Sequence, residues 1–348
     1  MKMNKLFIGL VVAVVGLASC HNADITYPNF DYQTVYFANQ YPARTVELGE
    51  DLYVDNSIDN QHKIIIKATM GGTRDNKKNV IIDFKVDNSL CNGIYFASQA
   101  TSGSKVIPMP SNYYSLASNQ ITIPPGSIMG GVEVQLTDAF FADPMSLVNT
   151  YAIPLLMTSV QNADSILQGR AVVDNPNRCV SGNWSVAPKD YVLYVVKYVN
   201  TWHGNYLRRG TDVITKTSDN SKTTTIRHAT YVENNDLVKL STSALLSNLL
   251  PLTIKDSGGK SITYNLVLNF DNAGNCTVNS NSSDFVISGK GKYVSKGDKN
   301  SIGGIDRDAL YLDYSVNFTK LGLIYATQDT LVLRDRTVAP EYYTVAKN

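Results

Sequence analysis

The chain has 348 residues, of which 43% are hydrophobic, and its formal net charge is +1. This length is enough for two domains with ordinary hydrophobic cores. The near-neutral charge argues against a nucleic-acid-binding protein and against electrostatic adhesion to anionic lipid.

The first twenty residues predict a lipid-anchored, exported protein. Lys2 and Lys5 precede an apolar run over residues 6–18 that is shorter than the ~20 residues of a transmembrane helix. The run ends in Leu17-Ala18-Ser19-Cys20, which resembles a lipobox. We therefore expect residues 1–19 to be a signal peptide, Cys20 to be lipidated, and residues 20–30 to form a tether. The alternative is an ordinary signal peptide or an unprocessed anchor helix.

Residues 31–174 are rich in short, β-branched segments that are bounded by Gly, Asn, Asp or Pro, as is typical of strands. These segments are residues 64–68, 80–86, 120–123, 132–136 and 151–157. Several short strands with turn signals between them predict a β-sandwich. The turn-forming residues 174–177 and 181–183 then place a domain boundary near residue 175.

Residues 175–348 also have the pattern of β-strands. Tyr191–Val199 is apolar on both alternating faces, which predicts burial on both sides. Residues 262–270 and 276–279 flank a turn that contains Gly274, which predicts a hairpin. Residues 309–318 alternate, with Leu310 and its even-numbered neighbours on one face and Asp313 on the other. We expect an antiparallel barrel with one short helix at Thr242–Leu250.

Motifs of the common catalytic and cofactor sites do not occur in the sequence. The four His form no metal-binding pattern, and GxSxG, P-loop and GxGxxG sequences are missing. Asp306 and Asp308 could form a carboxylate pair, but a solvated turn is the favoured interpretation. We therefore predict no catalytic residue, metal or cofactor. Beyond Cys20, the widely spaced Cys91, Cys179 and Cys276 permit at most one disulfide, and burial as small apolar residues is favoured.

Aromatic and polar side chains that suit sugar binding are concentrated between residues 184 and 210. Aromatic rings pack on the apolar faces of sugars, while Arg, Asn and His donate hydrogen bonds to hydroxyls. The candidate ligand-binding residues are Trp202, His203, Tyr206, Arg208 and Trp184, with Trp202 the first choice because it lies in a polar loop. The competing interpretation is that Trp202 closes one end of the barrel.

Three stretches together resemble a two-domain family of Bacteroidetes-type surface lipoproteins. These are residues 121–126 followed by 132–134 (ITIPPG, VEV), residues 150–155 followed by 165–167 (TYAIPL, SIL), and residues 191–194, 197–200 and 202–210 (YVLY, KYVN, WHGNYLRRG). The resemblance covers essentially the whole mature chain. It implies an all-β protein in which an N-terminal immunoglobulin-like β-sandwich, residues 31–174, precedes a C-terminal lipocalin-like barrel, residues 175–348. It also implies glycan capture beside an outer-membrane transporter of the polysaccharide-utilisation type.

These observations favour an outer-membrane lipoprotein that binds poly- or oligosaccharides, is not an enzyme and is exposed at the cell surface. Asp24 is the only acid close to Cys20, and an anchor that faces the periplasm therefore stays open. A structural or adhesive surface protein is the first alternative and a glycan-active hydrolase the second. A shallow groove with exposed aromatic rings would favour the binder, and a deep cleft with converging acids would favour the enzyme. Complete burial of the aromatic rings would favour a scaffold or adhesin.

Overall fold

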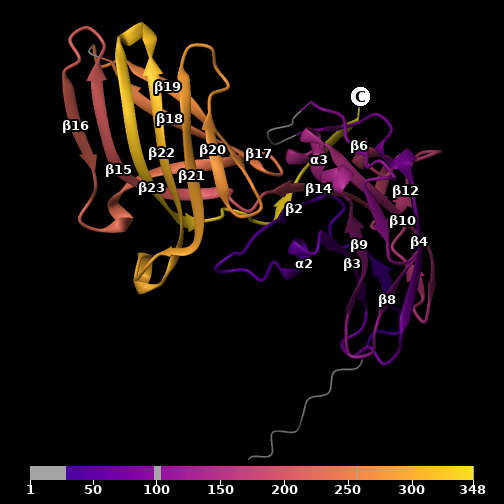
Figure 1. Cartoon of the computed structure of the whole chain (residues 1–348). Helices are drawn as coiled ribbons and strands as arrows, with labels where there is room; N and C mark the ends of the chain where they lie inside the picture. The colour runs from indigo at the N-terminus through magenta and orange to yellow at the C-terminus, as the bar shows by residue number, and fades with distance from the viewer. Residues whose placement is uncertain (1–28, 98–102, 257, 348) are drawn as a thin grey trace, which may run out of the picture.

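The structure is a computed structural model that describes residues 29–97, 103–256 and 258–347 (Figure 1). The signal peptide over residues 1–19, the lipidation of Cys20 and nearly all of the tether lie outside the described residues. Within the described ranges, no helix has both the length and the apolar character needed to cross a membrane.

The first domain is a β-sandwich, as predicted. Its strands are β1 (Thr34–Tyr36), β2 (Pro42–Glu47), β3 (Lys63–Gly71), β4 (Val80–Val86), β5 (Ile94–Phe96), β6 (Ile107–Pro108), β7 (Tyr114–Leu116), β8 (Gln120–Ile123), β9 (Met129–Leu136), β10 (Tyr151–Gln161), β11 (Ser165–Ile166), β12 (Arg170–Ala171), β13 (Trp184–Val186) and β14 (Tyr191–Val199). The helices are α2 (Ser57–Asn60) and α3 (Asp138–Ala142), with 3-10 turns η1 (Asn88–Cys91), η2 (Pro144–Leu147) and η3 (Ser181–Asn183). The main sheet runs β11-β1-β3-β9-β8-β4-β10-β14-β2-β24. Between β9 and β8 only the pair Thr122 and Gly131 is in register, and the two arms of the sheet enclose one core.

Strand β14 belongs to the first domain, which moves the junction from the expected residue 175 to about residue 200. It pairs with β10 in the antiparallel sense and with β2 in the parallel sense. Val192 and Val196 face the main core, whereas Leu193 and Val195 face a second apolar cluster. Burial on both faces is confirmed. The physical reason is that a strand with two apolar faces needs cover on both sides. Between β10 and β2, one face of β14 packs on the main core and the other on the second cluster.

The second domain is a closed antiparallel barrel, as predicted. Its strands are β15 (Gly204–Lys216), β16 (Lys222–Arg227), β17 (Asp236–Ala244), β18 (Ser247–Lys255), β19 (Ser261–Phe270), β20 (Asn275–Asn279), β21 (Val286–Asp298), β22 (Arg307–Phe318) and β23 (Leu323–Asp335), with 3-10 turns η4 (Val232–Asn234), η5 (Ile302–Gly304) and η6 (Thr319–Leu321). The sheet closes where β15 pairs with β23. Along its other edge, the long β15 pairs first with β17 and then with β16. The hairpin β19–β20 and the alternation of β22 are confirmed.

The helix expected at Thr242–Leu250 is wrong, because these residues form the end of β17, a turn and the start of β18. Leu250 and Leu252 both point into the barrel core. Their spacing of two is that of a strand, and pairing with β17 and β19 supplies backbone partners that a helix would have found locally. A short apolar run does not by itself distinguish the two structures.

A charged network lies inside the barrel between β15, β16 and β23. Arg227 donates to both oxygens of Asp212 at 2.9 Å and to Asp329 at 2.8 Å, and Arg208 donates to Asp329 at 2.8 Å. Gly210 lies between Arg227 and Asp329 in the register. A Cβ atom at this glycine would lie 2.4 Å from an Asp329 carboxylate oxygen. The missing side chain therefore lets the Arg227 guanidinium reach across β15.

The chain returns to the first domain after the barrel. Strand β24 (Glu341–Tyr342) pairs with β2, and β25 (Val345–Lys347) pairs with β5. Figure 1 shows the C-terminus on the first domain. The barrel is therefore an insertion between β14 and β24, and two chain crossings connect the domains.

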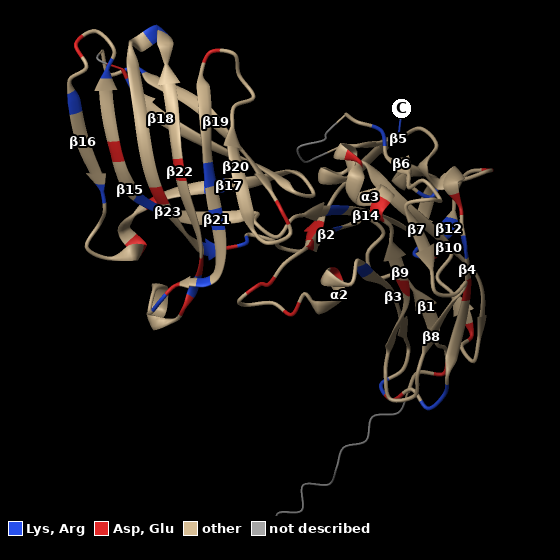
Figure 2. Ribbon diagram, in the orientation of Figure 1, with Lys and Arg blue, Asp and Glu red and all other residues tan. Residues whose placement is uncertain are grey.

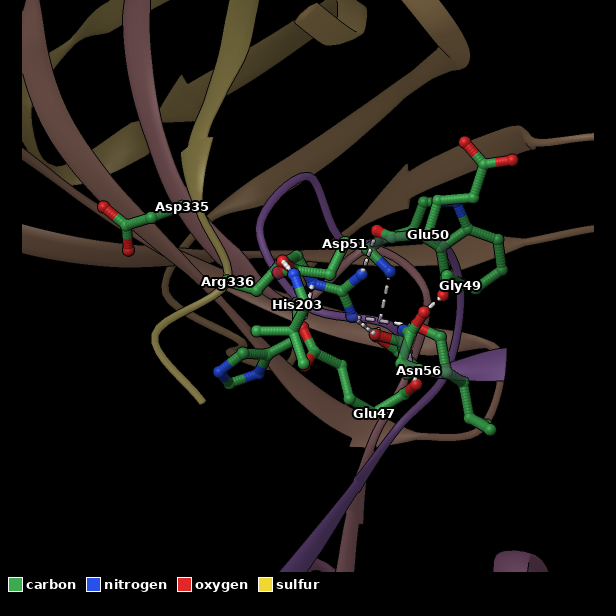
Figure 3. Close-up of polar contacts among 12 residues, drawn as sticks. Glu47, Gly49, Glu50, Asp51, Asn56, His203, Asp335 and Arg336 are labelled. Carbon is green, nitrogen blue, oxygen red and sulfur yellow. Dashed lines mark hydrogen bonds and ion pairs between the residues drawn. The ribbon is translucent and has the colours of Figure 1, made fainter. Parts of the chain in front are cut away.

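Arg336 links the two crossings to a loop of the first domain (Figure 3). Its side chain is buried, and its Nη2 donates to the carbonyls of Leu48 and Asn200, both at 2.8 Å. Nη1 donates to the carbonyl of Glu50 at 3.0 Å, and Nε lies 3.4 Å from a carboxylate oxygen of Glu47. One guanidinium thus satisfies three carbonyls from two different segments.

We expect Arg336→Met to loosen the junction, because it leaves three carbonyls without their donor and removes the positive charge beside the Glu47 carboxyl. The free energy of unfolding should fall by about 2–4 kcal/mol. Small-angle scattering should also show a wider range of domain orientations. Arg334→Met is the matched control, since Arg334 is partly exposed and pairs only with Asp335. Equal stability of the two variants would contradict this role.

The same junction makes stability depend on pH. Burial raises the pKa of Glu47 from 4.5 to about 7; Arg336 opposes this shift, and Asp51 adds to it. The folded state holds the proton more tightly than the unfolded state does. The stabilisation is therefore complete below pH 4.5 and is lost as the pH rises through about 7.

Between pH 5 and pH 8, wild type should lose roughly 1–3 kcal/mol relative to Glu47→Gln, which cannot ionise. Urea unfolding of both proteins across this range measures the difference. If the unfolding free energies of wild type and Glu47→Gln changed with pH in parallel, Glu47 would not titrate in this range.

Candidate functional site: a trough across the outer face of the barrel

Two rows of outward-facing side chains cross the barrel wall, one from β16 to β21 and the other from β15 to β20. One row contains Ile226, Thr211, Gln328, Asp313 and Lys290, which are successive partners in the register. The other contains Arg209, Thr330, Tyr311, Lys292 and Asn275, with His228 beside its β16 end. Together the rows border a cavity of about 700 Å³, which we call the trough.

The floor of the trough is the row of residues between these two. It contains Arg227, Gly210, Asp329, Leu312 and Gly291. Since alternate residues of a strand face opposite sides, the side chains of Asp329 and Leu312 point into the barrel and leave backbone beneath the trough. Five neighbouring strands at a spacing of about 4.8 Å give the trough a length of about 20 Å. It can therefore take an extended ligand that lies across the strands.

Tyr311 supplies an aromatic surface near the middle of one row. Its side chain is 38% exposed, and its hydroxyl donates to the carbonyl of Gly297 at 3.1 Å. This bond holds the ring in place. Arg209 is held in the same row, because its guanidinium donates to Asp298 at 2.6 Å. The trough thus offers a fixed ring beside amide, hydroxyl and charged groups.

The structure places two of the candidate ligand residues in the barrel core. The ring of Trp202 stacks on Phe270 at 3.9 Å and 9°, and only 6% of the residue is exposed. Tyr206 is fully buried, and its hydroxyl donates to the carbonyl of Trp202. Because these rings already have protein neighbours, the structure agrees with the competing interpretation that Trp202 closes one end of the barrel.

The other candidates have structural partners as well. Arg208 belongs to the charged network inside the barrel, and His203 accepts the backbone N–H of Thr242 at 3.1 Å. Burial lowers the pKa of His203 to about 4 and keeps it neutral at pH 7. Trp184 lies in β13 of the first domain, where its Nε1 donates to the carbonyl of Asn177. The structure thus does not bring Trp184 together with Trp202.

Asp306 and Asp308 act as local structural acceptors. Asp306 accepts from the Lys299 side chain and the Asn300 backbone, and Asp308 accepts from Tyr293 and the Lys296 backbone.

Cys91, Cys179 and Cys276 are free thiols. Burial raises the pKa of the Cys91 and Cys276 thiols to about 12. Across the described ranges, no group of three or more His, Cys, Asp or Glu side chains is arranged to hold a metal ion.

Sequence reasoning missed the trough, although it placed Asp313 on the face of β22 opposite to Leu310. The available signal was the set of polar residues that alternate with core residues on β15, β21, β22 and β23. Each strand by itself shows only a solvated face. The register between strands far apart in the sequence, such as β15 and β23, is what aligns these faces.

Comparison with known proteins identifies the family. Residues 201–337 match a family model described as a domain of unknown function (DUF5627), and residues 29–164 match a model for an N-terminal domain. Among curated proteins, none matches the sequence. A crystal structure from Bacteroides ovatus, described as of unknown function, is 55% identical with a TM-score of 0.86, and the match covers 92% of this chain and 100% of that chain.

Two other Bacteroides ovatus structures are each 11% identical to this chain. A multidomain protein that includes DUF1735 gives a TM-score of 0.40, with 85% of this chain and 91% of that chain covered. A protein provisionally described as carbohydrate-binding gives 0.26, with 90% and 97% covered. The 55% identity over nearly the whole chain shows that this protein belongs to the two-domain Bacteroides family of unknown function, in which an N-terminal domain precedes a DUF5627 domain.

Proposed function

We propose that this protein is a non-catalytic, lipid-anchored outer-membrane protein that binds glycans at the cell surface through the trough. The observation that carries the proposal is the trough itself, in which the fixed Tyr311 ring lies beside polar side chains along a length of about 20 Å. A sugar ring can pack on tyrosine while its hydroxyls bond to Gln328, Thr330 and Asn275. The open, elongated shape suits an oligosaccharide better than a single sugar.

The carboxylates near the trough support binding over hydrolysis. Hydrolysis of a glycosidic bond ordinarily needs two carboxyl groups on opposite sides of that bond, about 5–9.5 Å apart. Asp313 faces the trough, whereas Asp329 points into the barrel and is occupied by Arg208 and Arg227. A glycan-active hydrolase is therefore less well supported. A structural or adhesive role needs no trough, and it remains the alternative if no glycan binds.

Delivery of the glycan to an outer-membrane transporter belongs to the same proposal and rests on the family resemblance.

The proposed lipid anchor rests on the lipobox at Leu17–Cys20. An anchor of more than one acyl chain holds a protein stably to a membrane, which a near-neutral protein surface does not.

We expect mass spectrometry of the native protein to show Cys20 as an acylated N-terminal residue, and Cys20→Ala to release the protein from membranes. Fractionation of cells that express each form measures the second effect. A free Cys20 thiol or an intact Met1 would contradict the anchor.

The trough predicts a clear effect of Tyr311→Ala on glycan binding. A glycan array with the form that begins at His21 would identify a ligand, and calorimetric titration would give its affinity. Loss of the ring should weaken binding about tenfold, because a stacking contact contributes ~1–1.5 kcal/mol.

Tyr311→Phe should retain most of the affinity, because the ring is kept. Tyr32→Ala is the matched control, since Tyr32 is an exposed tyrosine of the first domain. Wild-type affinity in Tyr311→Ala would exclude the trough as the site. If the protein bound no glycan at all, the structural or adhesive role would be the better supported function.

A further inference from the structure

The β21 end of the trough differs from the rest in charge. Lys290 and Lys292 lie on the same outward face of β21, one in each row, with Gly291 between them. Residues two apart on a strand are separated by about 7 Å. The two residues therefore border the trough floor from both sides at this end. Figure 2 shows basic bands on β21 beside an acidic band on β22.

The two lysines are not neutralised by ion pairs. Lys292 donates to the carbonyl of Ala273 at 2.6 Å and to the amide oxygen of Asn275 at 3.0 Å, and both acceptors are uncharged. The side chain of Lys290 makes no hydrogen bond or ion pair with the described residues, and Lys290 lies opposite Asp313 in the register. Each lysine thus keeps donors for a ligand.

The other acids near this end are occupied. Asp298 accepts from Arg209, and Asp271 accepts from the backbone N–H groups of Ala273 and Asn275. Asp313 is the one exposed carboxylate among the trough residues, whereas two lysines border this end. The β21 end therefore has an excess of positive charge next to the Tyr311 ring.

We propose that the trough selects anionic glycans, with a carboxylate or sulfate group of the sugar bound between Lys290 and Lys292 and the adjacent sugar ring packed on Tyr311. The proposal rests on the proposed function and names its ligand class. A bridging anion takes one charge-assisted hydrogen bond from each lysine, and such bonds are stronger than those between neutral groups. A neutral sugar at the same position would leave both lysines without this gain.

The experiment compares matched glycans on the wild-type form that begins at His21. The first pair is polygalacturonate oligosaccharides and the same oligosaccharides with their carboxyl groups reduced to alcohols. The second pair is dextran and dextran sulfate, which tests whether a sulfate group increases the affinity. We expect one anionic member to bind at least fivefold more tightly than its neutral counterpart. We also expect this preference to shrink between 50 mM and 500 mM NaCl, since exposed charges are screened by salt.

Lys290→Gln should weaken binding of the preferred anionic glycan about three- to fivefold, the range for an exposed ion pair, and leave its neutral counterpart unaffected. This variant removes no hydrogen bond or ion pair among the described residues, and the exposed position of Lys290 tolerates glutamine. Lys255→Gln is the control, because it removes the same single positive charge from an exposed position on β18 outside the trough.

Each outcome separates the two proposals. Equal affinity for neutral and anionic glycans, together with loss of binding in Tyr311→Ala, would overturn the anionic class and leave glycan binding in place. If Lys290→Gln and Lys255→Gln weakened binding of the anionic glycan equally, the effect would come from the overall charge, and the proposal of an anionic ligand would be overturned. Absence of binding to every glycan would overturn the proposed function itself.

Discussion

Strand β14 imposes the constraint on which the arrangement of the two domains depends. Its apolar residues on both faces have to be buried, and its position between β10 and β2 places an apolar cluster against each face. The chain leaves this sheet at Asn200 and can enter the barrel only from there. The return after the barrel to β2 and β5 then makes the barrel an insertion. An inserted domain has two connections, which restrict its orientation more than a single linker would.

The junction is fixed by one buried cation and several carbonyls. Arg336 is attached to Leu48, Glu50 and Asn200, and Arg307 adds a second link by donating to the Tyr53 hydroxyl at 3.1 Å. Burial of a guanidinium is costly unless hydrogen bonds compensate for lost hydration, so these carbonyl partners act as a set. The cost of the arrangement is a Glu47 carboxyl in a desolvated position, which favours the protonated form.

In the barrel, structural residues lie on the inner face of the wall and candidate binding residues lie on the outer face. Inward-facing side chains include the apolar core and the network of Arg227, Asp212, Asp329 and Arg208, which fixes β16 to β15 and β23. Outward-facing residues of the same strands make the trough. Because the pairing of five strands sets the positions of the trough residues, the floor beneath a bound ligand is rigid backbone. A rigid floor reduces the ordering cost of binding.

Local pattern alone determined much of this protein. Alternation identified the apolar face of β22, and the turn around Gly274 identified the hairpin β19–β20. Apolar residues at both odd and even positions identified β14 as buried on both faces. These features depend on neighbours a few residues apart. The helix at Thr242–Leu250 failed because the partners of that segment, β17 and β19, are assigned only by closure of the barrel. Only tertiary structure decided that β14 joins the first sheet, that Trp202 is core, and that Lys290, Tyr311 and Gln328 align across strands distant in sequence. Register between such strands is set by the packing of the whole barrel, and no local pattern contains it.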